Sequence, residues 1–80
     1  MLKMSVHSKL DPEDVVTRAV EFFKKKHEMK INEQSSTGVC FQDALGKVDV
    51  VACADRKGTT VEFSSVEWDH EVREFARRLP

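Results

Sequence analysis

Apolar and polar residues alternate with a period of two in several stretches of this 80-residue chain, the pattern typical of β-strands with one buried face. The alternation is clearest near the start, where Leu2, Met4 and Val6 are separated by polar residues. Similar or β-branched runs, which favour strands, lie at residues 29–32, 39–41, 48–54 and 59–63. The pattern therefore predicts a sheet of five strands.

Between the first two strands, the apolar positions take the spacing of an amphipathic helix. Asp11 is a suitable N-cap acceptor, and Pro12 suits the first helical position. One arc of the helical wheel then holds the apolar residues Val15, Val16, Ala19, Val20, Phe22 and Phe23. We expect this helix to end in the run Lys24–Lys26, whose charges complement the negative end of the helix dipole.

A second helix is predicted at the end of the sequence. Ser64 and Glu67 match the Ser-x-x-Glu capping box, and an apolar stripe follows at Trp68, Val72, Phe75 and Leu79. Glu67 and His70 also have the Glu-x-x-His spacing of di-iron helices, but such a site needs further ligands from neighbouring helices. Because His70 falls opposite Trp68 on the wheel, we interpret the motif as a capped helix with an exposed histidine. We expect no metal and no cofactor.

The predicted order of elements is β-α-β-β-β-β-α. The short links among the last four strands favour an antiparallel meander, and both helices must then cover the same face of the sheet. We therefore expect an α+β fold, a five-stranded and mainly antiparallel sheet with two helices packed on one face. Residues 1–80 are too few for two hydrophobic cores, which predicts one domain.

Charge and composition exclude several classes of protein. The chain has 13 basic and 14 acidic residues, so it lacks the overall positive field that gathers nucleic acid or anionic lipid. No stretch is apolar enough to be a secretory signal or a membrane span, and we expect a cytoplasmic protein.

Cys40 and Cys53 lack Cys-x-x-Cys spacing, and the predicted register separates them by roughly 13 Å. This is too far for a disulfide.

The second face of the sheet is not uniformly polar. Cys40, Val51 and Cys53 alternate away from the predicted helix-covered face and form an apolar centre among polar residues. His7 is the one histidine predicted on the same face. Because no third helix is available to cover this centre, we expect a homodimer or a protein partner to dock there. Cys40, Val51, Cys53 and His7 are the interface candidates.

Two other functions follow from other residues. His27 lies at the end of the first helix's apolar stripe, where it is either a boundary residue or part of a functional site. The functional alternative is a ligand-binding or weakly catalytic pocket between helices and sheet, which would use His27 or His7 with Cys40 or Cys53. Nucleic-acid binding would require Lys24–Lys26 to lie beside Arg77 and Arg78. We expect a binding protein rather than an enzyme, without a catalytic residue.

The order of elements resembles the β-α-β4-α topology of the TATA-binding-protein half-repeat and, with additions, of the helix-grip ligand-binding proteins. The first likeness would imply nucleic-acid binding by the open sheet face, through apolar wedges inserted between bases. Here that face carries no phenylalanine, and its lysines are offset by Asp49 and Glu62. The second likeness would imply an apolar ligand held between sheet and helix.

Overall fold

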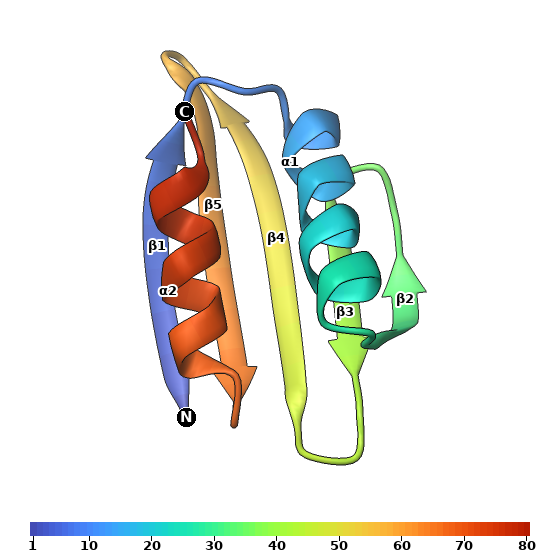
Figure 1. Cartoon of the computed structure of the whole chain (residues 1–80). Coiled ribbons are helices and arrows are strands. Elements are labelled where there is room, and N and C mark those ends of the chain that lie inside the picture. Colours follow the sequence, from blue (N-terminus) through green and yellow to red (C-terminus); the bar gives the residue numbers. More distant parts are fainter.

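Two helical segments lie against one face of a five-stranded sheet in the computed structural model, which describes residues 1–80 (Figure 1). The elements are β1 (Leu2–Ser8), α1 (Pro12–Ala19), η1 (Val20–Lys26), β2 (Lys30–Gln34), β3 (Gly38–Gln42), β4 (Lys47–Asp55), β5 (Gly58–Val66) and α2 (Asp69–Arg78). The order β-α-β-β-β-β-α and the predicted α+β class are confirmed. No helix has the length and apolarity needed to cross a membrane.

The strands lie in the order β1-β5-β4-β3-β2, and every neighbouring pair is antiparallel. Strands β2 to β5 form a meander in which each strand pairs with the next along the chain. The remaining pair joins β1 to β5, from Leu2 opposite Ser65 to Ser8 opposite Thr59. This pairing makes β4 the central strand and places β1 and β2 at the two edges.

The first helix begins as predicted but changes its winding. Pro12 occupies the start of α1, whereas the side chain of Asp11 makes no capping hydrogen bond, so that part of the prediction is wrong. From Val20 the segment continues as η1, a π-type helix with hydrogen bonds to the fifth residue back. It closes where the Met29 amide donates to the Phe23 carbonyl at 3.0 Å, after Glu28 has taken a left-handed φ of 59°.

The closing helix begins later than the capping box predicts. β5 continues to Val66, and Ser64 lies in the ladder opposite Lys3 on one side and Asp49 on the other. Strand pairing on both sides holds the backbone of Ser64 extended, so it cannot cap a helix. Glu67 then takes a left-handed φ of 68°, and α2 starts at Asp69. The capping-box prediction is therefore wrong.

The hairpin between β3 and β4 anchors the start of α2. Oδ1 of Asp43 accepts hydrogen bonds from the amides of Leu45 (2.9 Å) and Gly46 (2.8 Å) and from the indole N–H of Trp68 (3.2 Å). Partial desolvation opposes ionisation, but the hydrogen bonds outweigh it and hold the pKa of Asp43 below its ordinary value. One carboxylate thus joins a hairpin turn to the residue that precedes a helix.

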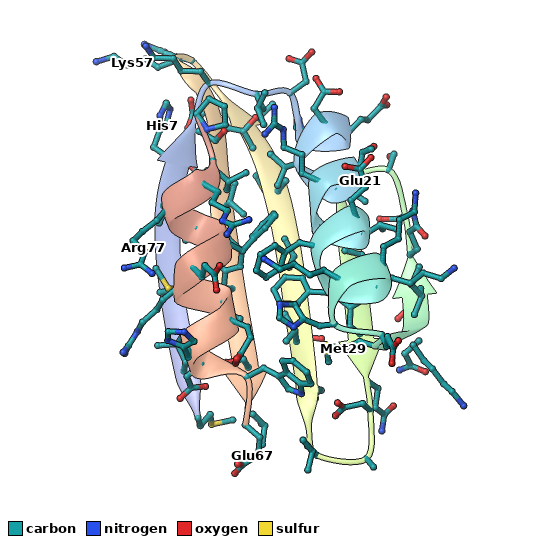
Figure 2. All side chains as sticks on the ribbon, viewed as in Figure 1. His7, Glu21, Met29, Lys57, Glu67 and Arg77 are labelled. Atoms are coloured by element: carbon teal, nitrogen blue, oxygen red, sulfur yellow. The ribbon has the colours of Figure 1, made fainter.

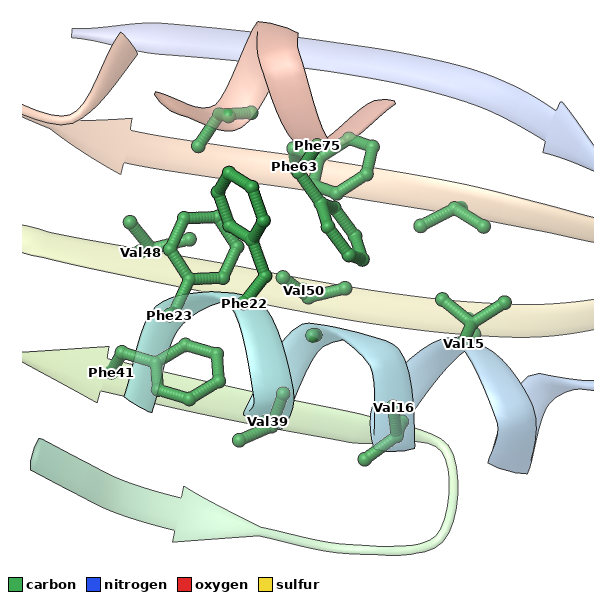
Figure 3. Close-up of a cluster of buried hydrophobic side chains, with 14 of the residues drawn as sticks. Val15, Val16, Phe22, Phe23, Val39, Phe41, Val48, Val50, Phe63 and Phe75 are labelled. Carbon is green, nitrogen blue, oxygen red and sulfur yellow. The ribbon is translucent and has the colours of Figure 1, made fainter. Parts of the chain in front are cut away.

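The core fills the space between the helical layer and the sheet (Figure 3). Phe23 is fully buried, with its ring centroid 5.2 Å from that of Phe41 on β3 and 5.5 Å from that of Phe75 on α2. Trp68 is partly buried and packs against this cluster.

At the far end of α2, the Pro80 carbonyl accepts hydrogen bonds from the Lys9 amide (3.0 Å) and the Ser8 hydroxyl (3.1 Å).

Candidate functional site

The face of the sheet opposite the helices carries no covering element, and we call it the open face (Figure 1). Its residues alternate with the buried ones along each strand. The open face includes Lys3, Ser5, His7, Lys30, Glu33, Cys40, Gln42, Lys47, Asp49, Val51, Cys53, Asp55, Thr60, Glu62 and Ser64. All the interface candidates therefore lie on one face.

Val51 lies on the central strand, midway along the open face. This residue is 44% exposed, whereas its neighbours in β4, Val50 and Ala52, are buried. It is opposite Gly38 on β3 and Glu62 on β5, so no large side chain on β3 shields it. A shallow groove continues from it across β4, β5 and β1, lined on the open face by Lys3, Ser5, Asp49, Glu62 and Ser64.

The chemistry of Cys40 is set by its cross-strand partner. Cys40 is opposite Asp49 in the β3–β4 pair, the register predicted from the sequence. Hydrogen bonding to Asp49, then burial and the negative charges of Asp49 and Glu33, raise the pKa of the Cys40 thiol to about 11. Glu33 is opposite Cys40 on the other side because the β2–β3 register shifts between Ile31 and Glu33. A thiol in this setting stays protonated near neutral pH and is a poor nucleophile.

Cys40 should accordingly react slowly with a disulfide reagent. A pKa about two units above normal reduces the thiolate roughly 100-fold, and the greater nucleophilicity of that thiolate recovers part of the loss, leaving a rate roughly tenfold lower. Reaction of the Cys53→Ser variant with Ellman's reagent at pH 8 measures the rate of Cys40, and Asp49→Asn in that background should accelerate it. An ordinary rate for Cys40 that is unchanged by Asp49→Asn would contradict this assignment.

His7 takes part in a polar cluster at one end of the open face. His7 Nε2 lies 3.3 Å from Oδ1 of Asp55, and the Thr60 hydroxyl donates to Oδ2 of Asp55 at 2.8 Å. Hydrogen bonds from Thr60 and from the Lys57 amide, with a smaller contribution from His7, hold the pKa of Asp55 below its ordinary value. Figure 2 shows His7 and Lys57 at this end of the molecule.

His7 does not meet either thiol. In the ladder, Thr60 is opposite His7 on one side and Cys53 on the other, so the histidine and Cys53 lie two strand spacings apart, or roughly 10 Å. Cys40 lies on the next strand beyond β4. A general base must be within hydrogen-bond reach of its nucleophile, directly or through one water. The structure therefore does not assemble the histidine–cysteine pair of the catalytic alternative.

His27, the pocket candidate, packs among aromatic rings. Its ring centroid lies 4.9 Å from that of Phe22, 6.4 Å from that of Phe23 and 5.7 Å from that of Trp68. Its Nε2 atom is buried without a hydrogen-bond partner. The helical wheel correctly placed His27 at the end of the apolar stripe. His7, Cys40 and Cys53 lie on the open face, on the other side of the sheet from His27.

The basic residues at the helix ends are only partly brought together. η1 ends at His27 beside Trp68, which precedes α2, so the two helices are antiparallel and the Lys24–Lys26 run lies toward the start of α2. Arg77 lies on the outer side of α2 (Figure 2). Lys26 and Arg78 nevertheless line one groove, each over the ring of Phe22. The condition set for nucleic-acid binding, adjacent basic helix ends, is therefore met for these two residues but not for Arg77.

Asp43 and Asp55 organise the two turns that flank β4. Each precedes a turn glycine by three positions, at Gly46 and Gly58, and each accepts a hydrogen bond from the backbone amide two residues on. An aspartate at this spacing is the signature of an Asx turn, so the sequence itself indicates both turns.

The structure gathers no group of three or more histidine, cysteine, aspartate or glutamate side chains that could hold a metal ion.

Comparison of the chain with protein-family models and with curated proteins finds no match.

Proposed function

We propose that this protein is a small, non-catalytic binding domain that pairs with a second copy of itself through the open face. The observation that carries the proposal is the exposure of Val51, 44% of its surface, at the centre of a sheet face that no helix covers. Covering this apolar centre is favourable at about 25 cal/mol for each Å² removed from water.

The surroundings of Val51 support a symmetric partner. The open face carries both signs of charge on its edge strands, at Lys3, Lys30 and Glu33, and on its inner strands, at Lys47, Asp49 and Glu62. A two-fold interface brings a surface against an identical surface, so a mixed-charge rim can meet opposite charges where a single-sign rim cannot. Two sheets that pack face to face lie about 10 Å apart, with their strand directions within about 30° of each other. Two copies of the open face could pack in this way.

The size of the face sets the expected affinity. Five strands about 4.8 Å apart and seven residues at about 3.3 Å each give a flat area of roughly 500 Å² per protomer. Stable interfaces usually bury about 800 Å² per partner. A face smaller than this, with one aliphatic side chain at its centre, supports a micromolar rather than a nanomolar dimer.

The reactive groups favour binding over catalysis. The pKa of Cys40, raised to about 11, keeps that thiol protonated, and His7 is engaged by Asp55 rather than by a nucleophile. Two free thiols on strands are also suited to a reducing compartment, which supports our proposal of a cytoplasmic location.

Sedimentation equilibrium tests the proposal through the Val51→Lys variant. We expect the wild-type protein to dimerise at tens to hundreds of micromolar, and Val51→Lys to stay monomeric because a lysine would bury its charge at the centre of the interface. Leu45→Lys is the matched control, since Leu45 is 72% exposed on the β3–β4 hairpin and outside the open face. A monomeric wild-type protein at high micromolar concentration, or equal effects of both substitutions, would overturn the proposal.

A further inference from the structure

A groove separates the two helical segments on the opposite side of the molecule from the open face. Its volume is about 260 Å³, and its apolar part consists of Phe22 from η1 with Phe75 and Leu79 from the other segment. Three cationic side chains also line it, Arg18, Lys26 and Arg78. We call it the interhelical groove. Apolar lining with a few convergent polar groups is the usual make-up of a small-molecule site.

A carboxylate already lies between two of these cations. Oε1 of Glu74 lies 2.7 Å from Nη2 of Arg78 and 3.8 Å from Nζ of Lys26. Both cations lie over the ring of Phe22, with Nζ of Lys26 at 5.1 Å and Cζ of Arg78 at 5.6 Å from its centroid. The side chain of Glu74 is only 27% exposed. The arrangement is that of a carboxylate held by two cations beside an aromatic surface.

The groove retains positive charge beyond this internal pairing. Arg18 lies four residues before Phe22 on the same side of the helical segment, lines the groove, and has no carboxylate within ion-pair distance. Glu74 and Glu21 supply two negative charges against the three positive charges of Arg18, Lys26 and Arg78. An anionic group entering the groove therefore meets cations that the chain's own carboxylates do not fully neutralise.

We propose that the interhelical groove binds a small organic carboxylate with an aromatic or short aliphatic body, and that Glu74 competes with it for Arg78 and Lys26. The apolar body packs on Phe22, Phe75 and Leu79, and the carboxylate takes a charge-assisted hydrogen bond from the guanidinium group. Binding to this groove is independent of pairing through the open face, because the two surfaces lie on opposite sides of the sheet.

The volume of the groove limits the ligand. A space of about 260 Å³ is smaller than the roughly 300–1,000 Å³ of pockets that hold drug-sized molecules, so a body of one ring or about six carbons fits. The groove is open to solvent along its length, and a ligand of about nine heavy atoms at modest efficiency binds with a Kd on the order of 1 mM.

Titration of the ¹⁵N-labelled full chain with sodium benzoate, at ionic strength matched with chloride, tests the proposal. Amide shifts should be concentrated around Phe22, Phe75 and Leu79, and benzyl alcohol, which lacks the charge, should produce much smaller ones. Glu74→Gln removes the internal competitor and should lower the Kd for benzoate at least threefold. Arg78→Gln removes the main partner of the carboxylate and should raise it at least threefold.

Two further variants keep the test decisive. Arg77→Gln is the matched control, because it removes the same charge from the outer side of α2 (Figure 2) and should leave the Kd within twofold. Arg18→Gln should weaken binding without disturbing any ion pair of the folded protein. The proposal is overturned if Glu74→Gln does not strengthen binding, if Arg77→Gln matches Arg78→Gln, or if the shifts map elsewhere.

Discussion

Replacement of Phe23 by alanine is expected to lower the free energy of unfolding by about 3–5 kcal/mol, the range found when large buried aromatic residues are truncated. Phe23 is fully buried and its ring contacts those of Phe22, Phe41 and Phe75. It therefore joins η1 to β3 and to α2 at one point. Because domains of this size are stable by roughly 0.05–0.15 kcal/mol per residue, the loss would be a large fraction of the total.

Urea denaturation followed by the fluorescence of Trp68, the only tryptophan, measures this effect. Phe23→Leu should lose clearly less, since it preserves most of the apolar volume. Leu45→Ala is the control for a large-to-small change at an exposed site, because Leu45 is 72% exposed, and it should stay within about 0.5 kcal/mol of the wild type. Equal losses at positions 23 and 45 would show that the core is not where the structure places it.

Gly46→Ala is expected to have the second largest effect, a loss of about 1–3 kcal/mol. A Cβ atom at position 46 would overlap the backbone carbonyl oxygen of Val66, at the end of β5. Backbone atoms cannot rotate aside as a flexible side chain can, so the hairpin from Asp43 to Gly46 would have to move. That movement would pull the Asp43 carboxylate away from the Trp68 indole, which it accepts from at 3.2 Å.

The same denaturation experiment, with the emission maximum of Trp68 in the folded state, tests this prediction. Gly46→Ala should both lower the stability and change the emission, because the indole loses its hydrogen bond. Gly38→Ala is the matched control, since its added Cβ would lie 3.3 Å from the Val50 carbonyl, a tight but tolerable approach. If Gly38→Ala proves the more harmful of the two, close approach to Val66 is not the reason for glycine at position 46.

Local patterns in the sequence predicted the sheet well because strand alternation is set by burial on one face. The same alternation correctly placed His7, Cys40, Val51 and Cys53 on the open face. The capping-box prediction failed at Ser64, where the local motif competes with strand pairing on both sides. Tertiary pairing decided the outcome, and no local signal could have revealed it.

The features that set the chemistry depended on register and packing. Glu33 acts on Cys40 only because the β2–β3 pair shifts by one residue. Glu74 falls away from the apolar stripe of α2 on a helical wheel, yet its carboxylate lies between Arg78 and Lys26 because η1 runs alongside. The angle between two helices is not encoded in the periodicity of either one.

The pairing of β1 with β5 has a consequence for how quickly the chain reaches its folded state. Each pairing within the meander joins strands that are neighbours in the sequence. Ser8, in contrast, pairs with Thr59, and the segments α1 and η1 and the strands β2, β3 and β4 lie between them in the chain. Joining them closes a loop of about 50 residues, whose entropy must be lost before the contacts reward it. This one non-local pairing raises the contact order above that of a simple meander, which places the protein among the slower-folding small domains.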